Sequence, residues 1–125
     1  MSILNDFYTV NSTEDLGNGD YRVYISLNKN HAIFQGHFPG NPVTPGVCMM
    51  QIVKELTESI IGKKLFLTSA SNVKFMAIIN PEETPDLLIE LNIAEPGDEI
   101  KVKNSAYFGE TVALKMSVNY KITTQ

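Results

Sequence analysis

A single histidine lies in a stretch of the sequence that is rich in glycine and proline. Residues 36–51 read GHFPGNPVTPGVCMMQ, in which His37 is followed by Pro39, Pro42 and Pro45. Prolines fix φ and reduce the conformational freedom of the chain, so this loop holds the imidazole on a restricted backbone. A neutral imidazole is a natural general base near pH 7. The loop is therefore a candidate catalytic segment, although a lone histidine in such a loop is more often structural.

The chain directly after this loop has the features of a helix N-terminus. Thr44 is a suitable N-cap residue, and Pro45 suits the first helical position. The first turn of a helix has N–H groups without partners, which here belong to Gly46, Val47 and Cys48. Gly46 lacks a side chain, so a ligand atom can approach its N–H closely. With the helix dipole, these donors favour a developing negative charge, as on the carbonyl oxygen of an ester or thioester.

Hydrophobic periodicity indicates the elements that position these residues. Residues 20–28 carry apolar side chains at every second position, which predicts a strand with one buried face. Residues 30–45 are a loop dense in glycine and proline. The apolar residues that follow recur at the spacing of one helical face: Met49, Ile52, Val53, Leu56 and Ile60. Gly62, followed by two lysines, predicts the end of this helix.

The second half of the chain is predicted to form strands. They cover 65–79, as one long strand or two short ones, 87–95, 100–108 and 111–122. Gly109-Glu110 joins the last two as a hairpin. One apolar helix face can cover one apolar sheet face, so the predicted fold class is α+β, an antiparallel sheet wrapped around one long central helix. Such a sheet leaves edge strands exposed, and pairing two copies edge to edge would cover them.

Composition limits the classes of function. The chain has 125 residues, 43% of them apolar and 19% charged, which predicts one globular domain spanning 1–125. A net charge of -4 argues against non-specific nucleic-acid binding. The single cysteine excludes an internal disulfide. We find no signal peptide and no apolar stretch near the ~20 residues that span a bilayer, so we expect a cytoplasmic protein without a membrane span.

The segment HFPGNPVTPGV, residues 37–47, resembles the signature of the β-hydroxyacyl-(acyl carrier protein) dehydratases, which have the hot-dog fold. Residues 30–36 and 72–83 are similar to the flanking segments of that family, and the order of elements matches over nearly the whole chain. The resemblance implies a hot-dog dimer whose site is shared between subunits. It also implies a thioester substrate on the phosphopantetheine arm of acyl carrier protein, no other cofactor, no metal, and a place in fatty-acid or related lipid or polyene biosynthesis.

The resemblance also implies roles for individual residues. His37 would be the base that removes a proton next to the thioester carbonyl, and the Gly46 N–H would polarise that carbonyl. The family places its acid fourteen residues after the histidine, where this chain has Gln51. An amide can hydrogen-bond to a hydroxyl but cannot protonate it as a carboxylic acid can. Because the family's amide, one turn later, is here Glu55, we hypothesise that Glu55 supplies the acid; the alternative is a solvated residue paired with Lys54 or another neighbour.

Substrate-binding residues are expected around the same loop and helix start: Phe38, Pro39, Val47, Cys48 and Met50. Cys48 lies where a thiolate is favoured, but cysteine is also commonly buried, so we expect it in the pocket wall or the core. The acyl tunnel would be lined by Met49, Met50, Phe75 and Met76. His31 is expected to be structural.

Three functions stay open at this point. The first is a dehydratase with an altered acid, and the second is an acyl-thioesterase in which water attacks the polarised carbonyl. The third is a non-catalytic or partner subunit of a hetero-oligomeric dehydratase, in which a related chain supplies the acid. The expected assembly is a homodimer, with a higher oligomer or a heterodimer as alternatives. Acyl carrier protein is acidic, and the candidates for contact with it are Lys63, Lys64, Lys74 and Lys101.

Overall fold

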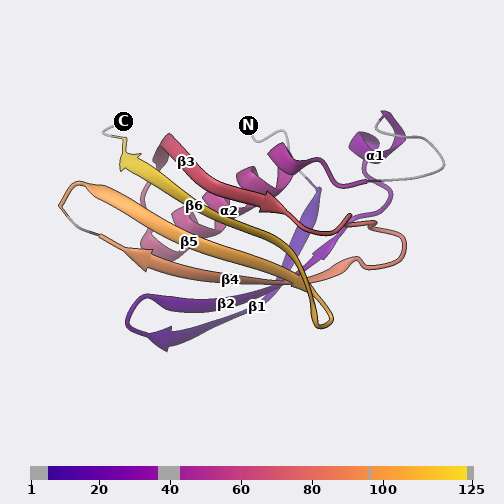
Figure 1. Cartoon of the computed structure of the whole chain (residues 1–125), viewed down its shortest axis with the longest axis horizontal. Helices are drawn as coiled ribbons and strands as arrows, with labels where there is room; N and C mark the ends of the chain where they lie inside the picture. Colours follow the sequence, from indigo (N-terminus) through magenta and orange to yellow (C-terminus); the bar gives the residue numbers. More distant parts are fainter. Residues whose placement is uncertain (1–5, 37–42, 96, 124–125) are drawn as a thin grey trace.

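A six-stranded antiparallel sheet with one long helix against it forms the architecture of the computed structural model, which describes residues 6–36, 43–95 and 97–123 (Figure 1). The elements in chain order are β1 (Tyr8–Gly17), β2 (Asp20–Leu27), α1 (Ala32–Gly36), α2 (Gly46–Ile61), β3 (Leu65–Phe75), β4 (Asp86–Ala94), β5 (Glu99–Phe108) and β6 (Thr111–Ile122). The predicted α+β class, with the sheet around one central helix, is confirmed.

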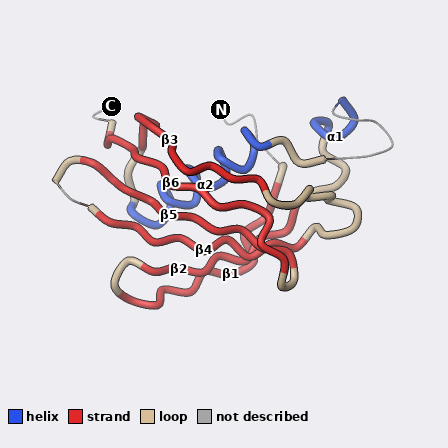
Figure 2. Tube along the Cα trace, viewed as in Figure 1, coloured by secondary structure: helices blue, strands red, loops and turns tan. Residues whose placement is uncertain are grey.

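The order of strands across the sheet is β1-β2-β4-β5-β6-β3, and all neighbouring strands are antiparallel (Figure 2). Strand β3 pairs with β6 and not with β4. The two edges of the sheet are therefore β1 and β3, the first and third strands of the chain. The hairpin between β5 and β6 turns at Gly109, whose φ is 60°, as the sequence predicts.

Helix α2 fits against the sheet through one apolar face. Its buried residues are Cys48, Met49, Ile52, Val53, Leu56 and Thr57, which confirms the predicted face except that Ile60 is only half-buried. They pack with inward residues at alternate positions of the strands, such as Leu87, Ile89, Leu91 and Ile93 of β4. Gly62 ends the helix with φ 72°, and its N–H donates to Glu58 O at 2.8 Å.

The start of α2 differs by one residue from the sequence prediction. The N-cap residue is Pro45, and no side chain caps the helix. Thr44 is therefore not the N-cap; it is buried, its N–H donates to Ile79 O at 2.9 Å, and its Oγ1 has no hydrogen-bond partner within the described residues. This backbone hydrogen bond to the segment after β3 holds Thr44, which therefore does not cap the helix.

Two elements were not predicted, and one prediction was too long. Strand β1 is exposed along almost its whole length, so it lacks the alternation that reveals a half-buried strand. Helix α1 has only five residues and lies inside the predicted 30–45 loop. Strand β3 ends at Phe75 rather than at residue 79.

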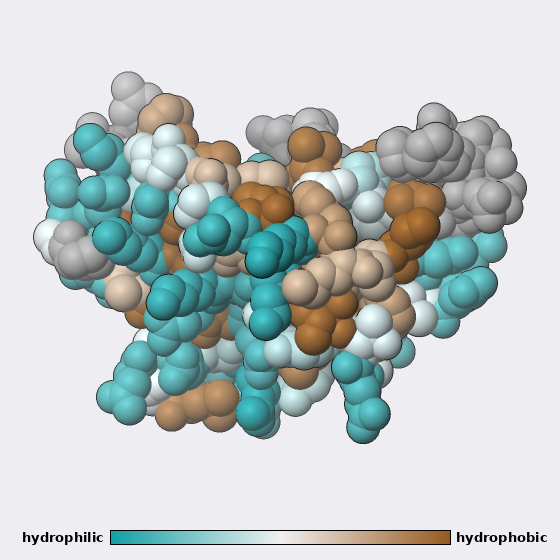
Figure 3. All heavy atoms as spheres, in the orientation of Figure 1, coloured by the Kyte–Doolittle hydropathy of each residue, from teal (hydrophilic) through white to brown (hydrophobic). Residues whose placement is uncertain are grey.

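Edge strand β3 exposes apolar side chains to solvent. Phe66 is 60% exposed and Phe75 is 55% exposed, and Leu67 and Val73 are also exposed. The sheet face turned away from α2 is largely hydrophilic, with hydrophobic patches between the polar side chains (Figure 3). Among the helices of the described residues, none has the length and hydrophobicity needed to cross a bilayer.

Candidate active site

The backbone donors at the start of α2 are fewer than the sequence suggests. Pro45 has no N–H, and its carbonyl oxygen accepts the Cys48 N–H at 3.0 Å and the Met49 N–H at 3.3 Å. The Cys48 donor is therefore occupied, contrary to the prediction. Gly46 and Val47 keep the N–H groups that helical geometry leaves without intrahelical acceptors. The prediction that this turn polarises a carbonyl now depends on these two residues.

A cavity of about 230 Å³ lies beside Gly46. Its lining residues are Val43, Thr44, Pro45, Gly46, Met49, Phe75, Ala77, Ile78 and Ile79. The ring of Phe75 approaches Gly46 so closely that a Cβ on Gly46 would lie 2.6 Å from Phe75 Cζ. Any side chain at residue 46 would therefore displace the ring of Phe75, which is exposed and can move. The end of β3 and the first turn of α2 form one apolar pocket with the backbone donors at its wall.

A second, groove-like cavity of about 500 Å³ lies between α2 and β3. It is lined by Val47, Met50, Gln51, Lys54, Phe66, Leu67 and Tyr120. Val47 is 71% exposed, so the wall formed by the helix is open to solvent. Gln51, where the resemblance implies an acid, therefore lies in an apolar groove together with Val47 and Met50, two of the predicted substrate-binding residues.

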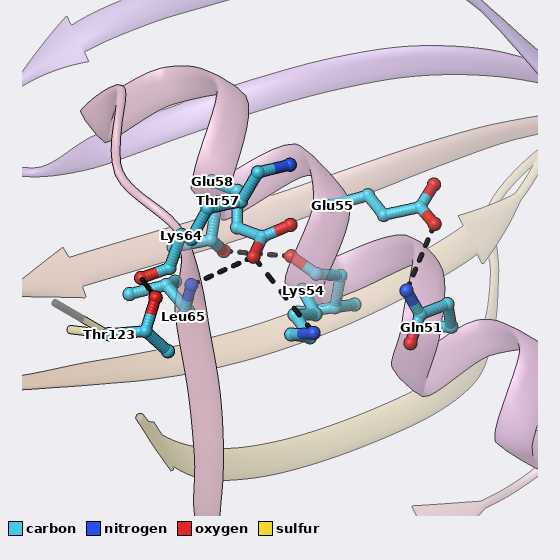
Figure 4. A network of polar contacts seen from close by, with 9 residues as sticks. Gln51, Lys54, Glu55, Thr57, Glu58, Lys64, Leu65 and Thr123 are labelled. Carbon is cyan, nitrogen blue, oxygen red and sulfur yellow. Dashed lines mark hydrogen bonds and ion pairs between the residues drawn. The ribbon is translucent and has the colours of Figure 1, made fainter. Parts of the chain in front are cut away.

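Glu55 is held by hydrogen bonds from two elements of the fold. Gln51 Nε2 donates to Glu55 Oε2 at 3.0 Å (Figure 4), and Tyr8 Oη donates to Glu55 Oε1 at 2.8 Å. Burial, together with the hydrogen bond and the negative charge of Glu55, raises the pKa of Tyr8. The phenol therefore stays protonated and remains a donor. Each carboxylate oxygen of Glu55 thus has a donor in the same chain.

The expected partner of Glu55 was Lys54 or another neighbour, and within the described residues it is the neighbour Gln51 rather than Lys54. Lys54 Nζ lies 3.9 Å from Glu58 Oε2, which also accepts the Leu65 N–H at 2.8 Å (Figure 4). Glu58 thereby ties the end of α2 to the start of β3. Glu55 lies beside Glu58 in a cleft of about 350 Å³ that also contains Lys63 and Lys64.

Two other candidate residues have structural roles in the described part of the chain. Cys48 is 3% exposed, and burial raises the pKa of its thiol. Cys48 is therefore an inert core residue with a protonated thiol, not a reactive thiolate. His31 Nδ1 accepts the Ile33 N–H at 3.1 Å, and its ring meets Phe7 edge-on. His31 is thus a structural residue, as expected.

The structure brings some predicted residues together and leaves others undescribed. Gln51 and Glu55 lie one turn apart on the same side of α2, whereas Gly46 lies at the start of the helix and lines a different cavity. His37, Phe38 and Pro39 lie outside the described residues. Sequence reasoning missed Tyr8, because its contact with Glu55 spans 47 positions and no local pattern reports it. Within the described residues, no group of three His, Cys, Asp or Glu side chains is arranged to hold a metal ion.

Comparison with known proteins identifies the family. The model of the ApeI-like family, described as ApeI dehydratase, matches residues 12–115. The chain belongs to the ApeI-like dehydratase family. It is also 33% identical over 112 residues to the 3-hydroxyacyl-(acyl-carrier-protein) dehydratase FabZ of Clostridium acetobutylicum, covering 83% of this chain and 74% of that protein. The FabZ of Enterococcus faecalis is 32% identical over 116 residues, covering 86% and 76%.

The solved structures agree on the fold. A chain of the dehydratase heterocomplex ApeI:P from Xenorhabdus doucetiae aligns with a TM-score of 0.73 and 19% identity, covering 90% of this chain and 96% of that chain. The resemblance to the hot-dog dehydratases is therefore confirmed, and the chain is a 3-hydroxyacyl-(acyl carrier protein) dehydratase-like protein of the ApeI-like family.

Proposed function

We propose that this chain acts on 3-hydroxyacyl thioesters of acyl carrier protein and removes water to give the trans-2-enoyl thioester. The observation that carries the proposal is the arrangement along α2: backbone donors at Gly46 in one apolar pocket, and the hydrogen-bonded pair Gln51 and Glu55 beside a second apolar groove. Relatives named as dehydratases of carrier-bound hydroxyacyl groups support this substrate class.

In the proposed reaction, the Gly46 N–H stabilises the negative charge that develops on the thioester oxygen. His37 removes a proton from the carbon next to the carbonyl, and the electron pair forms the new double bond. The bond from the next carbon to its hydroxyl breaks, and the hydroxyl leaves as water after gaining a proton. We assign that proton to Glu55. Because Gln51 lines the groove and Glu55 does not, the transfer uses one bridging water.

We propose that the working unit is a dimer built through β3 and the exposed side of α2. The donors at Gly46 and the side chain of Gln51 line different cavities of one chain, so a second subunit is needed to bring both kinds of group to one substrate. The apolar residues Phe66 and Leu67 on an edge strand, next to the exposed Val47, support this surface. The similar chain in a dehydratase heterocomplex supports a related chain as the alternative partner.

We place the carrier-protein contact on the outer face of the sheet. Lys74 and Lys115 are directly opposite each other in the register of β3 and β6, and with Lys103 they line a depression of about 270 Å³. None of the ion pairs within the described residues involves these three lysines. Like charges opposite one another are destabilising, so an acidic partner would relieve the repulsion. Lys74 adjoins Phe75, which forms the wall of the Gly46 pocket.

The test is a hydratase and dehydratase assay on purified protein with carrier-bound trans-2-enoyl and 3-hydroxyacyl thioesters. We expect turnover in the wild type and a ~10²–10⁴-fold loss in His37→Ala and in Glu55→Gln. Glu83→Gln, at an exposed glutamate of a loop, is the matched control and should retain full activity.

Other results would favour the alternatives. An inert wild type that becomes active with a related hot-dog chain would make this protein a partner subunit. Release of free acid without an enoyl product would make it a thioesterase. A fully active Glu55→Gln would remove Glu55 from the mechanism while leaving the dehydratase assignment intact.

A further inference from the structure

Strand β1 contributes a side chain to the helix that carries the candidate acid. Tyr8 is the first residue of β1 and pairs with Leu27 of β2 in the sheet register. Its ring is half-buried and packs against the core, so the sheet fixes its position. Its hydroxyl reaches α2, where it donates to Glu55 Oε1 at 2.8 Å. The contact joins an edge of the sheet to the middle of the central helix.

The two oxygens of Glu55 have different surroundings as a result. Oε1 faces Tyr8, whereas Oε2 accepts the hydrogen bond from Gln51, which lines the apolar groove. A phenol can donate to a carboxyl group in either protonation state, because a protonated carboxyl keeps an acceptor oxygen. The Tyr8 contact therefore persists when Glu55 gains a proton. Gln51 can turn its amide so that the carbonyl oxygen, instead of the N–H, faces Oε2 and accepts its proton, which places the proton on the side of Gln51 and the groove.

We infer that Tyr8 is a positioning residue for Glu55, which orients the carboxyl group so that Oε2 is the oxygen that exchanges a proton toward the groove. This inference rests on the proposed acid role of Glu55. A hydrogen bond donated to a carboxylate also favours the charged form, so Tyr8 lowers the proton affinity of Glu55. Without the phenol, the carboxyl group would rotate and hold its proton more tightly.

Other charges surround Glu55 and must be kept constant in a test. On its own helix, Lys54 pairs with Glu58, which lies in the same cleft as Glu55. The segment after the helix adds Lys63 and Lys64 to this cleft. Tyr8→Phe changes none of these groups and keeps the packed ring, so any change in the titration of Glu55 reports the lost hydroxyl alone.

The experiment measures the titration of the Glu55 side-chain carboxyl by carbon-13 NMR in the wild type and in Tyr8→Phe, with Glu55→Gln to assign the resonance. We expect the pKa of Glu55 to rise by roughly one unit in Tyr8→Phe. The limb of the kcat profile that titrates with Glu55 should move to higher pH by the same amount. Below this limb, where Glu55 is protonated in both proteins, we expect kcat to fall roughly tenfold with KM unchanged, because the carboxyl group has lost its orientation.

Tyr24→Phe is the matched control. Tyr24 Oη donates to Glu14 Oε1 at 3.4 Å in an exposed tyrosine–glutamate pair between β2 and β1, so its loss should change neither the Glu55 titration nor the kcat profile. An unchanged Glu55 pKa in Tyr8→Phe would overturn the inference, whatever Glu55→Gln does to turnover. Full activity of Glu55→Gln would instead remove the proposed acid, and the positioning role with it.

Discussion

Replacing Gln51 by glutamate would place a second carboxyl group against Glu55. Gln51 Nε2 lies 3.0 Å from Glu55 Oε2, so Gln51→Glu brings two carboxyl oxygens to about that separation. At this distance two unit charges repel by about 1.4 kcal/mol in bulk water and by about 5.5 kcal/mol at an effective dielectric constant of ~20. About 1.36 kcal/mol corresponds to one pKa unit, so this repulsion raises the pKa for loss of the last proton from the pair by roughly one to four units.

Both side chains are half-buried, so we expect a shift between these limits, about two units from the ordinary glutamate value of ~4.3. One carboxyl of the pair is then partly protonated near pH 6 and lies at the groove. We expect turnover of the trans-2-enoyl thioester to rise about 10- to 100-fold over the wild type. Because the folded-state pKa is raised, Gln51→Glu should match the wild type in stability below pH 4 and lose about 2.7 kcal/mol as the pH rises to 8.

The assays are carbon-13 NMR titration of the glutamate carboxyls, urea unfolding at pH 4 and pH 8, and the hydratase assay. The matched control is the exchange variant, Gln51→Glu combined with Glu55→Gln, which has one carboxyl and should show neither the pKa shift nor the pH-dependent loss of stability. The reasoning is refuted if both carboxyls of Gln51→Glu titrate below pH 5 and if the variant is less stable than the wild type by the same amount at pH 4 and at pH 8.

Three further predictions test other parts of the molecule. Burial raises the pKa of Tyr8 and Tyr120 above the ordinary 10.0, so folding stability is complete below pH 10 and falls above it. The loss is about 1.4 kcal/mol per pH unit for each phenol, and Tyr120→Phe should reduce the slope in urea unfolding by that amount. Lys74→Glu should raise the midpoint of thermal unfolding by removing a repulsion of roughly 0.2–1 kcal/mol, and should raise KM for carrier-bound substrate but not for a pantetheine thioester. Gly46→Ala should displace the exposed Phe75 ring and lower kcat/KM at least tenfold, with little change in thermal unfolding because alanine is the better helix former.

Each of these predictions has an outcome that contradicts it. A stability that stays constant between pH 10 and pH 12 would argue against buried neutral phenols. An equal rise in KM in Lys29→Glu, at an exposed lysine in the loop after β2, would make the Lys74 effect non-specific. Unchanged kinetics in Gly46→Ala would show that the pocket beside Gly46 does not receive the substrate.

The sequence by itself determined the elements whose pattern is local. The apolar face of α2, its stop at Gly62 and the hairpin at Gly109 were predicted because helix periodicity and turn chemistry depend on near neighbours. Strand β1 was not predicted, because an edge strand with both faces exposed has no alternation to reveal it. The motif in residues 37–47 likewise indicated the family, since it is a contiguous set of residue types.

Only the tertiary structure decided which side chains meet. Tyr8 and Glu55 are brought together by the sheet that packs around α2, and Phe75 reaches Gly46 from the far end of an edge strand. The sequence offered Lys54 as a partner for Glu55, but the helix places Lys54 against Glu58 instead. Contacts between residues distant in sequence depend on register and packing across several elements, and no short segment encodes them. The sequence therefore predicts candidate residues for this site, but it does not predict which side chains hydrogen-bond to them.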